Sequence, residues 1–302
     1  MTMRERTNIP AFRRWTPPAP RYHRRMSHPT PRTVLGALVL LAATLGLGAQ
    51  AAPRTALTPG GIAHLRIAAA DTPRPAVHLG DRPVLVREEN GHWAAWVGLP
   101  LDLAPGAHTL RIIQNGAARS ATLKIAAKDY PVQHIRIKNP RMVDPNPDDM
   151  ARIEREAATQ NEIKTLFRDE AQPPLDFVTP VAGRHSSPFG LRRTFNGKPR
   201  APHRGLDIAA ATGTPIIAPA GGVVTHTGDF FFNGKTVFVD HGQGLISMFC
   251  HLDRIDARAG ERVAQGAPLG TVGMSGRATG PHLHWSVFLN ATPVDPALFL
   301  PR

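Results

Sequence analysis

Glycine and proline interrupt this chain so often that long helices are disfavoured over most of its length. The 302 residues include 30 prolines and 27 glycines, which end regular segments and favour turns. The apolar segments between them have the short length of strands. We predict a mainly β protein: a small N-terminal β-sandwich over residues 52–127, a linker with a helix over 128–176, and a compact antiparallel sheet domain over 177–302.

Residues 52–127 contain five short strand-like segments with turn signals between them. Asn-Gly pairs at Asn90-Gly91 and Asn115-Gly116 favour tight two-residue hairpin turns. This regular spacing is typical of an immunoglobulin-like sandwich. The histidines of this part stand singly, so we assign them no catalytic role. The predicted strands are His64–Ala68, Pro83–Arg87, His92–Val97, His108–Gln114 and Ser120–Ile125.

Further strands are predicted after residue 177, again separated by glycines. Their composition and spacing favour an antiparallel domain, but they do not indicate an activity. They are Pro215–Ala218, Gly222–Thr227, Thr236–Asp240, Leu245–Leu252, Pro268–Val272 and His282–Leu289.

One helix is predicted between the two β regions. Asn146 is a suitable N-cap, Pro147 suits the first turn, and acidic residues follow at the positive end of the helix. The helix is expected to end near residue 167. An apolar stripe is predicted along it, made of Met150, Ile153, Ala157, Ile163 and Phe167.

The first 51 residues have the pattern of a secretory signal peptide. An uncharged run over residues 34–48 follows basic residues and precedes Ala49-Gln50-Ala51, a small-residue cleavage site. The run is short for a membrane span, which needs about 20 residues. We therefore predict export to the periplasm or cell envelope, with no membrane span after cleavage; an uncleaved membrane anchor is the alternative.

The predicted export limits which ligands the positive charge of residues 52–302 could attract. Residues 1–51 hold eight arginines and one glutamate, so about half of the net charge of +13 lies there. The positive charge outside residues 1–51 would favour binding to an acidic polymer, or it contributes to solubility alone. No aromatic-rich basic motif is present, and we predict no nucleic-acid partner. Cys250 is the single cysteine, so no intramolecular disulfide can form.

The segment Gly280–Val287 (GPHLHWSV) contains the first chemical signal. In a strand, His282 and His284 project from one face, and the apolar Leu283 and Trp285 project from the other. A metal ligand with an acid–base neighbour would account for two imidazoles side by side. Such a site needs further ligands elsewhere in the chain.

A suitable partner lies earlier, in the segment Pro202–Ala210 (PHRGLDIAA). If this stretch is extended, His203 and Asp207 share a face, and Gly205 leaves the space between them open. Catalytic zinc sites use three protein ligands drawn from His, Asp, Glu and Cys, and keep one position open. His203, Asp207 and one of the pair His282/His284 would complete such a set.

His251 is the fifth candidate, on a predicted strand beside Cys250. Alternation places Met248, Cys250 and Leu252 on one face and His251 on the other. Cys250 fits a small buried residue better than a ligand. From spacing alone, His251 is either structural or part of the site.

The stretch 180–296 resembles the lysostaphin/LytM-type zinc metallopeptidases that cut peptidoglycan crosslinks. The resemblance rests on His203-x-x-x-Asp207, on His251-Leu252 after an apolar strand, and on Thr279-Gly-Pro-His-Leu-His284. Residues 60–167 also resemble the N-terminal β domain and helix that precede this peptidase domain in some Gram-negative members, less specifically.

The resemblance implies roles that spacing leaves open. It makes His203, Asp207 and His284 the ligands of Zn²⁺, and His251 and His282 the catalytic pair at the open side. It implies a zinc endopeptidase acting on peptidoglycan stem peptides, at the D-alanyl–diaminopimelate bond of a Gram-negative wall or at a glycine bridge. The alternative is a catalytically silent regulator that activates a cell-wall amidase. The chain differs from the family pattern at Cys250, because a tyrosine or alanine is expected before His251.

A basic loop precedes the first proposed ligand. Arg192, Arg193 and Asn196 lie there, where they would contact substrate carboxylates or form a solvated surface. The sequence leaves both alternatives open.

Overall fold

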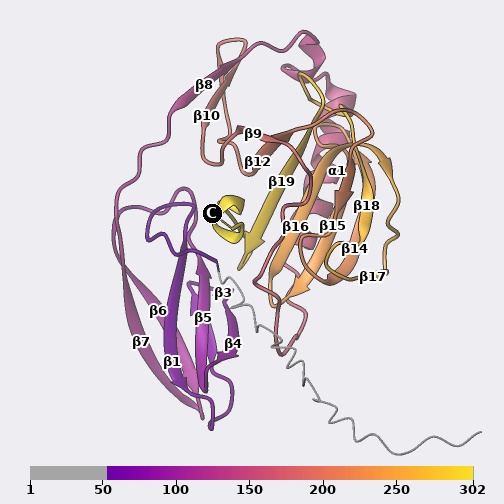
Figure 1. The fold of residues 1–302 in the computed structure, drawn as a ribbon. Helices are drawn as coiled ribbons and strands as arrows, with labels where there is room; N and C mark the ends of the chain where they lie inside the picture. Colours follow the sequence, from indigo (N-terminus) through magenta and orange to yellow (C-terminus); the bar gives the residue numbers. More distant parts are fainter. Residues whose placement is uncertain (1–52, 302) are drawn as a thin grey trace, which may run out of the picture. The chain divides into compact units, whose positions relative to one another are not determined.

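The computed structural model describes residues 53–301. The predicted signal peptide lies outside this range. The described chain is mainly β, with one α-helix, as predicted (Figure 1). No helix within residues 53–301 is long and apolar enough to cross a membrane.

The N-terminal part is a sandwich of two antiparallel sheets. One sheet has the order β1-β5-β4 and the other β3-β2-β6-β7. Both contribute side chains to a single apolar core, which includes Val97 and Leu110. The strands are β1 (Ile62–Ala69), β2 (Ala76–Leu79), β3 (Arg82–Pro83), β4 (Leu85–Glu89), β5 (His92–Gly98), β6 (Gly106–Gln114) and β7 (Ala117–Ile125).

The two Asn-Gly pairs form the predicted hairpin turns. Asn90 and Gly91 have φ values of 50° and 75°, and Asn115 and Gly116 have 51° and 76°. Positive φ at both central positions is what a type I′ turn requires, and Asn and Gly tolerate it best. These turns connect β4 to β5 and β6 to β7. The short strands β2 and β3 were not predicted as such.

The C-terminal part is built on one large antiparallel sheet. Its main path has the order β17-β14-β15-β16-β19-β12-β9, and β13, β18 and β20 attach to this path. The strands are β9 (Arg184–Ser187), β12 (Leu206–Ala209), β13 (Pro215–Ile217), β14 (Gly222–Phe230), β15 (Gly234–Gly242), β16 (Leu245–Ile255), β17 (Arg262–Val263), β18 (Pro268–Val272), β19 (His282–Leu289) and β20 (Thr292–Val294). A 3₁₀ turn, η2 (Pro296–Phe299), follows.

The segment between the two β regions takes part in the fold. Its strand β8 (Val132–Ile135) pairs in parallel with β10 (Arg192–Phe195), which also pairs with β11 (Lys198–Arg200). A 3₁₀ turn, η1 (Pro140–Met142), comes next. The sequence pattern gave no sign of β8, because its residues VQHI are too few and too mixed to show a period.

The helix α1 (Pro147–Lys164) follows the prediction in its start but not in its packing. The Asn146 side chain accepts a hydrogen bond from the Asp149 backbone N–H, as an N-cap does. Ile163 packs against the sheet, in a cluster with Phe238 and Phe288. The predicted apolar stripe is wrong at three positions. Met150 is 41% and Phe167 40% exposed, Ala157 is also exposed, and Phe167 lies beyond the last helical residue.

Candidate metal centre and groove

Two neighbouring strands bring Asp207 and His284 face to face. β12 and β19 pair antiparallel, with Asp207 directly opposite His284. Leu283 and Trp285, on the other face of β19, are completely buried in the main core. The alternation predicted for this strand is confirmed, and it fixes which face carries His282 and His284.

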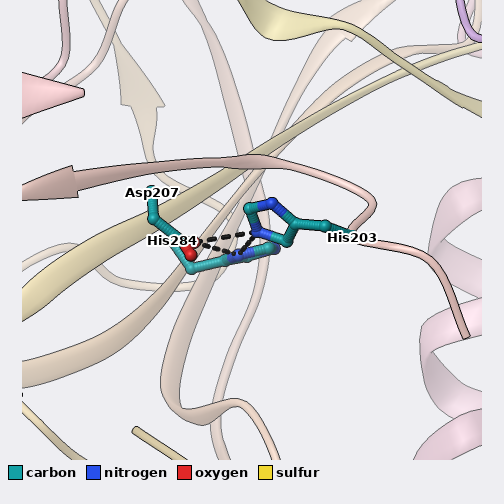
Figure 2. Close-up of side chains that lie close together, drawn as sticks. All are labelled: His203, Asp207 and His284. Atoms are coloured by element: carbon teal, nitrogen blue, oxygen red, sulfur yellow. Dashed lines mark hydrogen bonds and ion pairs between the residues drawn. The ribbon is translucent and has the colours of Figure 1, made fainter. Parts of the chain in front are cut away.

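His203 reaches the same place from the loop that leads into β12. Its backbone N–H donates to the Leu191 carbonyl, and its own carbonyl accepts from Gly190. This loop is not a strand, so the extended conformation considered for residues 203–207 applies only from Leu206 onward. Figure 2 shows the side chains of His203, Asp207 and His284 converging on one point.

Three possible ligand atoms meet in this His–Asp–His cluster. His203 Nε2 lies 2.9 Å from Asp207 Oδ1 and 3.0 Å from His284 Nδ1, and the last two atoms are 2.8 Å apart. Within residues 53–301, these three residues are the group of His, Cys, Asp or Glu side chains that could hold a metal ion.

The other ring nitrogens indicate where the protons lie. His203 Nδ1 is 2.8 Å from the Pro188 carbonyl oxygen, which only accepts, so Nδ1 carries a proton and, in the neutral ring, Nε2 carries a lone pair. His284 Nε2 is 3.0 Å from Ser286 Oγ, which can accept its proton and leave Nδ1 free. Such partners orient metal-ligating imidazoles.

These protonation states fit a cation at the centre of the cluster. Two imidazole lone pairs and a carboxylate oxygen repel one another unless a positive charge lies between them. The ligands of a tetrahedral zinc ion, at about 2.0–2.1 Å from the metal, are about 3.3 Å apart, close to the distances found here. The donor set therefore suits a divalent metal that accepts nitrogen and oxygen ligands.

The electrostatics keep these side chains in the forms that could bind a metal. Burial acts to raise the pKa of Asp207, but its interactions with His203 and His284 hold that pKa well below its ordinary value. Burial lowers the pKa of His284 to about 4. Near pH 7 the carboxyl is therefore ionised and this imidazole is neutral.

Arg193 holds the second oxygen of Asp207. Its Nη2 donates to Asp207 Oδ2 at 2.9 Å and to Ser187 Oγ at 3.0 Å, and its Nε donates to Gln133 Oε1 on β8 at 3.0 Å. With Oδ2 engaged, Asp207 presents Oδ1 alone to the cluster. Arg193 is therefore a positioning residue, a role that its place in a basic loop did not reveal.

Gly205 is needed where the His284 ring passes. A Cβ added at this glycine would lie 2.6 Å from His284 Nε2 and 2.6 Å from the Trp285 carbonyl oxygen. Since real Cβ atoms do not approach other atoms so closely, any side chain here would displace the imidazole. The open space predicted at this position is occupied by the His284 ring.

His251 and His282 lie beside the cluster, and each ring contacts a backbone carbonyl through its Nδ1. His251 Nδ1 is 2.8 Å from the Ser275 carbonyl oxygen, and His282 Nδ1 is 2.8 Å from that of Gly280. The two rings are 4.8 Å apart, and His282 Nε2 is 3.9 Å from Asp207 Oδ1. Burial, with His284 and His282 nearby, lowers the pKa of His251 to about 3, which keeps it neutral.

A β-bulge places His251. Between the pairs Lys235↔Leu252 and Val237↔Phe249, β16 has one residue more than β15, and His251 has φ = 65°. Bulges redirect side chains next to active sites. The strict alternation predicted here is therefore wrong: Leu252 joins the main core with Phe249, and His251 lines a groove together with Met248.

This groove has a volume of about 750 Å³. His203, His251 and His284 line it together with Met150 and Ile153 of α1. The exposure of Met150 thus has a physical reason, because its side chain faces the groove instead of the core. A smaller pocket of about 60 Å³ is lined by Asp207, His251, His282 and His284.

The remaining candidates have structural partners. Asn196 exchanges two hydrogen bonds with the backbone of Ile137, and Arg192 Nε donates to the Tyr130 carbonyl. Cys250 is 1% exposed, and burial raises the pKa of its thiol to about 11. It does not belong to the His–Asp–His cluster, in agreement with the expectation of a small buried residue.

Comparison with known proteins identifies the family. Residues 56–128 match the model of the peptidase family M23 N-terminal domain, and residues 201–296 match that of peptidase family M23. A Pseudomonas aeruginosa crystal structure assigned to peptidase M23 is 43% identical, with a TM-score of 0.69 over 81% of this chain and 95% of that chain. This chain belongs to peptidase family M23. The resemblance inferred from its motifs is confirmed.

Curated relatives also match part of the chain. Peptidoglycan DD-endopeptidase ShyC of Vibrio cholerae is 42% identical over 125 residues, which cover 41% of this chain and 28% of that protein. DD-carboxypeptidase/endopeptidase Mpg of Neisseria meningitidis is 40% identical over 116 residues, covering 38% and 27%. The matched region thus spans little more than a quarter of these relatives.

Proposed function

We propose that this M23 protein is a zinc-dependent endopeptidase that hydrolyses peptide crosslinks of peptidoglycan in the bacterial cell envelope. The observation that carries the proposal is the convergence of His203 Nε2, Asp207 Oδ1 and His284 Nδ1 beside two further imidazoles. Three ligands with neighbouring acid–base groups form the arrangement that metal-assisted peptide hydrolysis requires.

His203, Asp207 and His284 would hold the metal. When bound, zinc supplies a Lewis acid and lowers the pKa of a bound water toward about 7. Asp207 contributes the one negative charge of the set. Arg193 pairs with Asp207 Oδ2, the oxygen that faces away from the metal position. The two imidazoles add no charge, so the site keeps a net positive charge for polarising a peptide carbonyl.

His251 and His282 carry out the proton transfers in this proposal. Each donates its Nδ1 proton to a backbone carbonyl, so the neutral form of each ring presents an unprotonated Nε2. One of them takes the proton of the attacking water, and the pair stabilises the oxyanion and returns a proton to the leaving amine. Among residues 53–301, no glutamate lines the groove or the small pocket to serve as the base instead.

The substrate and location follow from the relatives and from the predicted signal peptide. ShyC and Mpg are named as a peptidoglycan DD-endopeptidase and a DD-carboxypeptidase/endopeptidase. By analogy we propose the D-alanyl–diaminopimelate crosslink as the bond cut here, in the periplasm. The N-terminal sandwich would then position the peptidase domain or restrict access to its groove.

A digest of purified crosslinked peptidoglycan tests this function. The protein is incubated with zinc or with a chelator, and the released muropeptides are identified by mass spectrometry. Conversion of dimers into monomers only without chelator supports a zinc endopeptidase and identifies the cut bond. If the protein binds one zinc per chain but cuts nothing, the catalytically silent amidase activator becomes the better proposal.

A further inference from the structure

The groove beside the His–Asp–His cluster carries far more positive than negative charge. Within the described range 53–301, five cationic side chains line it, against one carboxylate, that of Asp144. Asp144 is already paired, with Lys198 at 2.7 Å and Arg200 at 3.7 Å. The cationic residues are Lys164, Arg193, Arg200, Arg204 and Arg277. Such a groove favours an anionic ligand.

Arg277 differs from the other three arginines in its surroundings. Its guanidinium lies over two aromatic rings, 4.0 Å from the Phe232 centroid and 4.6 Å from that of Phe195. Its Nη1 donates to the Met142 carbonyl at 3.2 Å. Within residues 53–301, no carboxylate forms an ion pair with it, and its charged neighbours are Arg200 and Arg193.

A partly buried cation without a counter-ion is costly unless a ligand supplies one. Burial, with Arg200 and Arg193 nearby, lowers the pKa of Arg277 to about 10, the direction expected where negative charge is lacking. The two rings hold the planar group in one orientation, which reduces the entropy lost on binding. A guanidinium has five N–H donors, and most of those of Arg277 remain for a ligand.

Arg277 also lies where a ligand would meet the reacting groups. It lines the groove together with His251 and His284, and the small pocket together with Asp207 and His282. A planar anion bound to it therefore lies next to the proposed proton-transfer pair. A carboxylate matches the fork geometry of a guanidinium and can accept two of its hydrogen bonds.

We infer that Arg277 is a specificity-determining residue that binds a free carboxylate of the substrate next to the scissile bond. The inference rests on the proposed function and sharpens its substrate. In a D-alanyl–diaminopimelate crosslink, the carbon bonded to the scissile nitrogen carries such a carboxylate. In a glycine bridge, the corresponding carbon carries none. Arg277 thus favours the first crosslink over the second.

Two matched substrates test the inference: a crosslinked muropeptide dimer with this carboxylate free, and the same dimer with it amidated. The wild-type protein is expected to cleave the free form with a kcat/KM roughly 10- to 100-fold higher, the range for hydrogen bonds to a charged group. Arg277→Gln should lose this preference, mainly by cleaving the free form more slowly. Its activity on the amidated dimer should change little.

Arg204→Gln is the matched control. Arg204 lines the same groove but is exposed. Its loss therefore removes one positive charge and leaves the contacts of Arg277 with Phe195 and Phe232 in place. It should keep most of the preference for the free dimer. Equal loss of activity on both dimers in Arg277→Gln, with its zinc content and melting temperature unchanged, would overturn the inference.

Binding separates this inference from the proposed function. If the wild-type protein cleaves neither dimer, the proposed function fails, and calorimetric titration of both dimers still tests Arg277. Tighter binding of the free dimer by the wild type, with the difference lost in Arg277→Gln, supports a carboxylate site. Equal affinities for the two dimers would contradict it.

Discussion

The N-terminal sandwich and the C-terminal sheet bury different kinds of side chain. Across residues 53–301, fourteen polar or charged residues are buried, and none of them lies in the sandwich strands; all fall between Asp149 and Thr292. The sandwich instead has an apolar core, and its histidines stay half-buried or exposed. Burying a polar group is costly unless it is paired. The concentration of buried polar residues in the C-terminal region therefore indicates that the functional site lies there.

Removal of a proposed ligand should have the largest effect. Asp207→Ala takes away the one carboxylate of the cluster and leaves the partly buried Arg193 without its partner. We expect loss of bound zinc and a fall in turnover of roughly 10³-fold or more, since the metal supplies several kcal/mol of catalysis. Metal analysis and dimer cleavage measure both. Asp256→Ala, in a loop distant in the sequence, should retain both zinc and turnover.

A core substitution in the sandwich should affect stability instead. Leu110 is completely buried between the two sheets, so Leu110→Ala should lower the free energy of unfolding by about 2–5 kcal/mol. Below its melting temperature the variant should still bind one zinc. Loss of zinc from the folded variant would show that the packing of the sandwich core is coupled to the metal centre.

Gly205→Ala changes the site without changing a ligand. The added methyl group would push the His284 ring away from His203 and Asp207. A shift of about 1 Å can cost 10²-fold in rate, and we expect a loss of that order together with weaker zinc binding. For Gly221→Ala, the nearest atom to the new Cβ is at 3.6 Å, an ordinary contact. That control should behave like the wild type.

Substitution of His241 should have the smallest effect, a change in how the stability of the fold depends on pH. It is buried between the Gly221 carbonyl and Ser247 Oγ, and burial lowers its pKa to about 4, from 6.5. The unfolded chain therefore binds a proton that the folded chain does not, and stability falls as the pH drops from about 6.5 toward 4. Denaturant titrations at several pH values should show a shallower fall for His241→Gln. Identical pH profiles would indicate that His241 does not titrate on unfolding.

Regular elements were predictable from the sequence because their signals are local. The paired histidines of β19, the Asn-Gly turns and the Asn146 cap each depend on a few neighbouring residues, and the structure confirms them. The bulge at His251 depends on how three strands pair, and no local period encodes that. Strand β8 and the ion pair of Arg193 with Asp207 depend on contacts between distant segments. Tertiary structure alone reveals them.

Zinc content and turnover of a His251 variant test the central claim most directly. Because His251 has a positive φ, His251→Asn is the better substitution, since Asn tolerates that conformation. The account predicts one zinc per chain and no measurable dimer cleavage, which separates the ligands from the proton-transfer pair. Loss of zinc would make His251 a ligand, and retained cleavage would remove it from the chemistry; either result would contradict the account.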